Sequence, residues 1–281
     1  MSPKSARQMK LTLPEAVAKV IALLKAGEAH EARSLCLAIL QAAPDHVQTL
    51  CLHAVSSAEL GLQKDAVVSY QRALQLQPGI AQAHNNLGVA LRQLGRHEEA
   101  AASFRRAIKL EPESASAHTN LGVTYKDLGR LQEAAASCRR AAELDPALVE
   151  AYLNLGNIHW GQARHEEALD CYQNALRANP NYNRVHRSLG LALQELGRYD
   201  EAVGAFRRAL DLLPNDPETH YNLGVVLGQL RRYGEAANSY RNALALRPTY
   251  ASALNNLGLA LRVLGRLEQS AHCFRRAAEL R

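Results

Sequence analysis

The chain has 281 residues, of which 47% are hydrophobic and 21% are charged, a balance typical of a soluble protein with a substantial core and not of a disordered or collagen-like chain. Its net charge is +6, and Lys4, Arg7 and Lys10 account for half of that excess, so the remaining chain is only mildly basic. Aromatic residues make up 5%, which favours an aliphatic, helical core over a large β-sandwich.

The first twelve residues are polar and basic, and we predict a disordered tail over residues 1–12. This start lacks the apolar segment of a signal peptide, and no run approaches the roughly 18 apolar residues that a membrane span needs. We therefore expect a cytoplasmic protein. Its five cysteines form no CxxC pair, so neither a disulfide framework nor a zinc site is indicated.

From residue 13 onward the chain repeats itself. Prolines recur at a constant interval of 34 residues, at Pro44, Pro78, Pro112, Pro146, Pro180, Pro214 and Pro248. Placing this proline at position 32 divides residues 13–281 into eight units, which begin at residues 13, 47, 81, 115, 149, 183, 217 and 251. Such a fixed period predicts a stack of identical supersecondary units.

Each unit carries the pattern of two helices. Apolar residues recur at helical spacing, as in Leu87, Leu91 and Leu94, and a glycine at position 15 interrupts that spacing in six units. Leucine at position 7, glycine at position 8 and alanine at position 20 recur in most units, with Tyr or Phe common at position 24. The small residues predict a close approach of the two helices, with the position 24 ring filling the adjoining space. Proline at position 32 ends the second helix.

This pattern resembles the tetratricopeptide repeat (TPR) family over residues 13–281. The resemblance implies an all-α fold, a right-handed α-solenoid or superhelix of eight tandem helix-turn-helix units, with the first helix of each unit lining a concave groove. The first two units depart from the pattern, with Val20 in place of glycine and His53-Ala54 in place of Leu-Gly. No polar capping helix follows the last unit, which leaves two alternatives open: self-association through this end, or a longer natural polypeptide.

Little in the sequence indicates catalysis or a cofactor. Histidines recur at position 4, but helices 8 to 10 Å apart cannot place a linear row of imidazoles around one metal ion. No phosphate loop, nucleophile elbow or dinucleotide motif is present. We therefore expect no catalytic residue, no cofactor, no metal and no enzymatic activity. Arginine pairs at positions 25 and 26 could meet phosphates, but acidic residues begin the same helices, so a solvated face is the favoured interpretation.

The expected groove contains a row of carboxamides. Position 6 is asparagine in units 3, 4, 5, 7 and 8, with Ser188 in unit 6. Carboxamides both donate and accept hydrogen bonds and could hold the main chain of an extended peptide; the alternative is that they only bond neighbouring helices. The row resembles the asparagine row in the superhelix of O-linked N-acetylglucosamine transferases. The predicted groove residues are Asn86, Asn120, Asn154, Asn157, Asn222, Asn256, Trp160, Tyr221, Arg92, Lys126, Arg187 and Arg262.

These residues predict a scaffold or adaptor that binds a protein or peptide, either an extended segment or a partner helix. Groove charges nearly cancel, so recognition of the peptide backbone is favoured over electrostatic selection. An alternative is a substrate-recruiting region that serves a glycosyltransferase or sulfotransferase domain. Membrane binding is not expected, and nucleic-acid binding is disfavoured.

Overall fold

The computed structural model describes residues 11–280, and every regular element in that range is an α-helix. The predicted tail therefore lies outside the described residues except for Leu11 and Thr12, the latter preceding the first helix. The sixteen helices of residues 11–280 are α1 Leu13–Lys25, α2 Ala29–Ala42, α3 Val47–Glu59, α4 Gln63–Leu76, α5 Ala81–Gln93, α6 His97–Leu110, α7 Ala115–Asp127, α8 Leu131–Leu144, α9 Val149–Gly161, α10 His165–Ala178, α11 Asn183–Glu195, α12 Tyr199–Leu212, α13 Pro217–Gln229, α14 Tyr233–Leu246, α15 Ala251–Val263 and α16 Leu267–Glu279.

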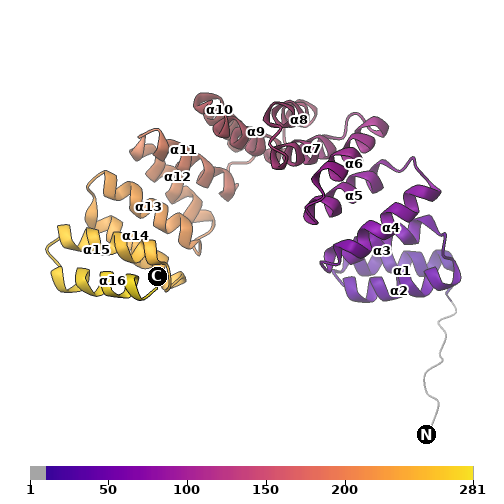
Figure 1. The fold of residues 1–281 in the computed structure, drawn as a ribbon, viewed down its shortest axis with the longest axis horizontal. Helices are drawn as coiled ribbons and strands as arrows, with labels where there is room; N and C mark the ends of the chain where they lie inside the picture. The colour runs from indigo at the N-terminus through magenta and orange to yellow at the C-terminus, as the bar shows by residue number, and fades with distance from the viewer. Residues whose placement is uncertain (1–10, 281) are drawn as a thin grey trace, which may run out of the picture. The chain divides into compact units, whose positions relative to one another are not determined.

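The helices confirm the predicted eight pairs. Each unit contributes one odd-numbered and one even-numbered helix, which pack on each other. The chain divides between Leu144 and Asp145 into two compact modules, an N-terminal module with α1–α8 and a C-terminal module with α9–α16. Within each module, the second helix of a unit also packs on the first helix of the next unit, as the order of hairpins in Figure 1 shows. Over residues 11–280, the helices are too short or too polar to cross a membrane.

The two helices of a unit meet where the sequence places glycine at position 8. A Cβ atom added to Gly88 would lie 2.7 Å from the Phe104 ring, and one added to Gly156 would lie 2.6 Å from the Tyr172 ring. Both rings are almost fully buried. Unit 4 has Cys138 at position 24, and its sulfur occupies the same place against the backbone of Gly122. The repeated glycine is therefore a packing requirement and not a helix break.

The turn between the helices of a unit contains one residue in the left-handed region. Glycine occupies this place in six units, with φ between 72° and 78°. Units 5 and 7 instead have Ala163 and Arg231, with φ of 57° and 58°. A residue with a Cβ atom is strained there by roughly 1–2 kcal/mol.

Replacing Ala163 or Arg231 by glycine should therefore stabilise the protein. We expect a gain of about 0.5–1 kcal/mol for each change, because relief of strain exceeds the added entropy of the unfolded chain. Chemical denaturation followed by circular dichroism measures the effect. Gly129→Ala, at the same position of unit 4, is the matched control and should shift stability in the opposite direction. Equal stability of all three variants would contradict this account of the turn.

The second unit shows how a departure from the pattern is accommodated. His53 replaces the leucine of position 7 and is buried. Its Nδ1 atom lies 2.8 Å from the Ser69 hydroxyl, in a hydrogen bond between the two helices of the unit. Burial lowers the pKa of His53, and the nearby Arg33 charge lowers it further. The neutral imidazole thus serves as a core side chain with one polar partner.

Candidate peptide-binding groove

The asparagines of the N-terminal module bond to neighbouring side chains. The Asn120 amide donates to Asn85 Oδ1 of the preceding unit at 3.1 Å. Asn86 Oδ1 accepts from Gln82 Nε2 at 2.8 Å, one turn earlier on the same helix. Part of the hydrogen-bonding capacity of both carboxamides is thus used within the chain. The Asn120 bond matches the alternative that the row bonds neighbouring helices, whereas the Gln82–Asn86 bond stays within α5.

The C-terminal module differs, because two of its position 6 asparagines are unpaired. Asn154 on α9 and Asn222 on α13 are half-buried, and among residues 11–280 their side chains have no hydrogen-bond partner. Asn256 on α15 donates to the Tyr221 hydroxyl at 3.3 Å. A carboxamide offers two donors and an acceptor oxygen, so Asn154 and Asn222 retain their full capacity for a ligand.

The other predicted aromatic and amide residues pack mainly within the module. The Trp160 ring lies 4.3 Å from the His165 ring, between the first and second helices of unit 5. The Tyr221 ring lies 4.9 Å from the ring of Tyr250, which ends the same unit and directly precedes α15. Asn157 accepts a hydrogen bond from the Tyr172 hydroxyl at 2.8 Å, and burial raises the pKa of Tyr172 to about 12. The Tyr172 hydroxyl therefore keeps its proton near neutral pH and donates it in the hydrogen bond to Asn157.

The four predicted basic residues have different environments. Arg92 lies 3.6 Å from Asp127 of the next unit, and Arg187 is engaged by two acidic residues described below. Lys126 and Arg262 are exposed and make no ion pair within residues 11–280. Only the last two are available to an acidic group of a ligand.

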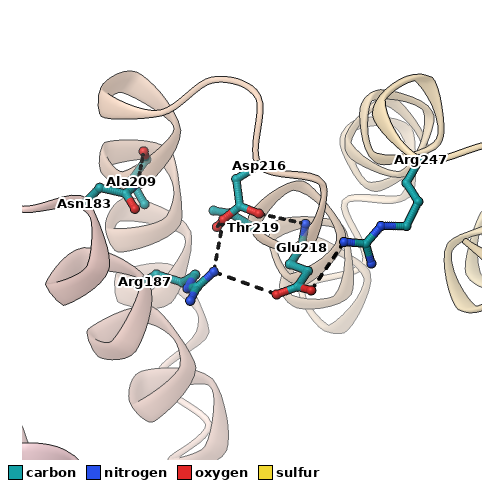
Figure 2. A network of polar contacts seen from close by, with 7 residues as sticks. All are labelled: Asn183, Arg187, Ala209, Asp216, Glu218, Thr219 and Arg247. Atoms are coloured by element: carbon teal, nitrogen blue, oxygen red, sulfur yellow. Dashed lines mark hydrogen bonds and ion pairs between the residues drawn. The ribbon is translucent and has the colours of Figure 1, made fainter. Parts of the chain in front are cut away.

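Arg187 belongs to a polar network that joins units 6 and 7 (Figure 2). Its Nη1 atom lies 3.3 Å from Asp216 Oδ2 and 3.8 Å from Glu218 Oε2. Glu218 also meets Arg247 Nη2 at 3.4 Å. The Arg187–Glu218–Arg247 chain therefore runs from α11 to α13 and on to the residue that follows α14, as partly exposed ion pairs between these elements.

Asp216 is the buried centre of this network. It is the N-cap of α13 and accepts from the Glu218 amide at 3.1 Å and from the Thr219 hydroxyl at 2.5 Å. Burial raises the pKa of Asp216, but the hydrogen bonds from Thr219 and Glu218 and the Arg187 charge together outweigh it and hold the pKa below its usual value. The carboxylate is therefore charged at neutral pH.

The position 4 histidines have a structural role. Each Nε2 atom lies 2.7 to 3.1 Å from the carbonyl oxygen of the proline six residues earlier. An imidazole N–H that donates to this carbonyl ties the start of the unit to the end of the preceding one. Within the described residues, no cluster of three or more potential metal ligands occurs. The histidines are His84, His118, His186 and His220.

Several arginines of the pairs on the second helices meet acidic or polar groups. Arg207 lies 2.8 Å from Glu235 of the next unit, and Arg140 lies 3.1 Å from Glu143 of its own helix. Arg208 donates to Asn181 Oδ1 at 2.9 Å. These pairs are exposed and contribute little to stability. Their pattern favours a solvated, charge-balanced face over a phosphate-binding one.

A stack of helix pairs joined by inter-unit hydrogen bonds is the architecture of a helical-repeat scaffold. The sequence model of the cilia and flagella-associated protein 70 C-terminal domain matches residues 4–253, and a tetratricopeptide-repeat model matches residues 251–281. The chain therefore belongs to this family of tetratricopeptide-repeat proteins, and the TPR resemblance is confirmed. The narrower resemblance to the transferase superhelix stays a prediction.

Solved structures share the fold. YrrB, a TPR protein with an unusual peptide-binding site, is 26% identical with a TM-score of 0.58, over 64% of this chain and 93% of YrrB. The pilF protein of Pseudomonas aeruginosa is 25% identical with a TM-score of 0.62, over 69% and 88% of the two chains. The APC/C complex Cut9–Hcn1 gives a TM-score of 0.68 at 20% identity, over 89% of this chain but 49% of the matched one, and shows the fold alone. None of the curated proteins matches the sequence.

Two features of the site escaped the sequence analysis. Asp216 had a readable signal, because an acidic residue directly before Pro217 is a typical helix N-cap. Nothing in the sequence indicated the contact between Asp216 and Arg187, because 29 residues separate the two. The second feature is Gly228, at position 12 of unit 7, where units 3 to 6 and unit 8 carry a longer side chain. It lines a pocket between α13, α14 and α15, which the repeat pattern alone does not predict.

Proposed function

We propose that this chain is a protein-binding scaffold whose first helices hold an extended peptide by its main chain. The observation that carries the proposal is the pair of half-buried carboxamides at Asn154 and Asn222, which have no hydrogen-bond partner among residues 11–280. An extended peptide rises about 3.3 Å per residue, and packed helices are about 8–10 Å apart. Each unit therefore corresponds to roughly three peptide residues, and the carboxamides two units apart could bond main-chain groups about six residues apart.

The near-neutral charge of these positions supports backbone recognition. Arg187 is neutralised within the protein, and Arg262 is the remaining exposed cation among the predicted residues of the C-terminal module. A peptide held mainly through its amides needs no particular charge. Its affinity should therefore depend weakly on salt, whereas binding of nucleic acid by several arginines would fall by orders of magnitude between 50 and 200 mM salt.

The proposal predicts that Asn154→Ala combined with Asn222→Ala weakens peptide binding. Binders are first selected from a displayed library of random ten-residue peptides, and their affinities are then measured by fluorescence anisotropy. We expect the double variant to lose at least about 1 kcal/mol, or roughly fivefold in affinity, because each lost hydrogen bond contributes about 0.5–1.5 kcal/mol.

Asn238→Ala is the matched control. Asn238 is an exposed asparagine on α14, a second helix, and accepts from Arg241 one turn away at 3.0 Å. This variant should bind the selected peptides as the wild type does. If the double variant has a native circular dichroism spectrum and unchanged affinity, the carboxamides take no part in binding.

A further inference from the structure

A pocket of about 230 Å³ opens between α13, α14 and α15 in the C-terminal module. Val225 and Leu259 form part of its apolar wall, Gly228 and Ala236 contribute no bulk, and Asn256 adds a carboxamide. None of the residues that line it is charged. We call this cavity the Gly228 pocket.

The pocket exists because unit 7 has glycine at position 12. The same position carries Arg92, Lys126, Trp160, Gln194 and Arg262 in units 3, 4, 5, 6 and 8. A Cβ atom added to Gly228 would have the Tyr240 hydroxyl oxygen as its nearest neighbour, at 3.9 Å. A side chain at position 228 would thus begin in ordinary van der Waals contact with Tyr240 and without a clash, so the absent side chain accounts for the space beside Gly228.

One wall of the pocket is apolar and open to solvent. Leu259 is 44% exposed and Val263, one turn later on α15, is 57% exposed. Residues four apart lie on the same face of a helix, so the two side chains form one continuous surface. Its burial by a ligand would be favourable, at about 25 cal/mol per Å² of apolar area.

We propose that the Gly228 pocket receives a phenylalanine- or leucine-sized apolar side chain of the bound peptide. This inference rests on the proposed function and adds side-chain selectivity to it. An apolar cavity of about 150 Å³ accommodates benzene, so the larger pocket has room for a phenyl or isobutyl group. The uncharged lining disfavours a carboxylate or an ammonium group, which would lose its hydration without gaining a partner.

The position of Asn222 strengthens the assignment. It lies three residues before Val225 on α13, and residues three apart share a helix face. A peptide whose main chain bonds the free Asn222 carboxamide would pass close to the pocket. Successive side chains of an extended peptide point to opposite sides, so one residue in every two would face the helices and could enter the cavity.

The first test uses a probe that does not require the asparagines. N-acetyl-phenylalanine amide is titrated into the full chain, and the methyl NMR signals of Val225, Leu259 and Val263 are followed. We expect saturable shifts that N-acetyl-alanine amide does not produce. Gly228→Leu should abolish them by filling the cavity. Gly204→Leu is the matched control, because Gly204 is an exposed helical glycine with no neighbouring atom within 4 Å of an added Cβ, and it should retain the shifts.

Equal shifts with both amides, or shifts that persist in a folded Gly228→Leu protein, would overturn the proposal. Circular dichroism establishes that the variant is folded. Should Gly228→Leu fail to fold, Leu259→Ser, at an exposed wall residue, provides the same comparison and should weaken binding of the phenylalanine probe at least fivefold.

The second test uses the library-selected peptides and separates the two proposals. Alanine replacement of one apolar peptide residue should weaken binding to the wild type by about tenfold or more, but by less than twofold in Gly228→Leu. Equal affinities of wild type and Gly228→Leu for every peptide would overturn the pocket and leave the proposed function standing. If no peptide binds while the phenylalanine probe still shifts the methyl signals, the proposed function fails and only the pocket's apolar preference is confirmed.

Discussion

Gly190→Ala is expected to lower the free energy of unfolding by about 2 kcal/mol, although alanine is the better helix former. An added Cβ atom would lie 2.7 Å from Cε1 and 2.8 Å from Cδ1 of the Phe206 ring, well inside van der Waals contact. The ring is 0% exposed, so it cannot move aside without disturbing the packing between α11 and α12. Urea denaturation followed by circular dichroism measures the loss.

The same unit offers a matched control. Gly204 lies on α12, is exposed, and has no neighbouring atom within 4 Å of an added Cβ. Gly204→Ala should therefore stabilise the protein by about 0.5–1 kcal/mol. A smaller side chain at position 206 tests the cause directly: in a double-mutant cycle, Phe206→Leu should cost less in the Gly190→Ala background than alone. Similar effects at the two glycines would show that helix propensity, and not crowding, governs position 8.

Asp216→Ala is expected to lower the free energy of unfolding by about 2–3 kcal/mol. The change removes the N-cap of α13 and leaves the hydroxyl of Thr219, which is 0% exposed, without its acceptor. A lost cap costs about 1 kcal/mol and an unsatisfied buried group about 1–3 kcal/mol. Arg187 is 37% exposed, so hydration of its guanidinium replaces most of the interaction that it loses with Asp216. Denaturation at neutral pH measures the difference.

The Asp216→Asn variant removes the charge of Asp216 but keeps a side chain that can cap α13. Comparing it with the wild type therefore tests how the charge contributes to stability at different pH values. Because the pKa of Asp216 is lower in the folded than in the unfolded chain, its ionisation stabilises the fold at neutral pH. This contribution is lost as the pH falls from the usual aspartate value through the folded pKa. The stability advantage of wild type over Asp216→Asn should therefore be constant above about pH 5 and shrink below pH 4. A constant advantage down to pH 3 would contradict the assignment.

The repeat pattern made the fold predictable because the same physical constraints occur in unit after unit. Gly88 and Gly224 each face an aromatic ring of the second helix. Positions 8 and 24 of the repeat therefore make the same contact in both units. The repeat predicts the backbone conformation even where the residue type differs: Ala163 and Arg231 adopt the left-handed conformation that glycine adopts at this position in six other units. Tertiary packing of the neighbouring helices holds these two residues in a conformation that their own side chains disfavour.

The candidate site was predictable only in part. The asparagine row follows from sequence because its members share one position of the repeat. Whether Asn120 or Asn256 is free depends on the preceding unit, where its partner lies 35 positions away. The Asn120 side chain bonds to Asn85, whereas the Asn222 side chain makes no hydrogen bond within residues 11–280. The arginine side chain is long, so Arg187 can reach the carboxylate of Asp216. Its position in the repeat does not by itself predict that partner.

The sequence by itself determined the period, the helix pairs, the glycine–ring contacts and the family, because each of these depends on residues close in sequence and repeated in register. The tertiary structure decided which carboxamides stay free, that Asp216 binds Arg187, and that Gly228 opens a pocket beside Leu259. These features depend on distances between side chains of successive units, and such distances are set by helix packing and not by the pattern within one unit.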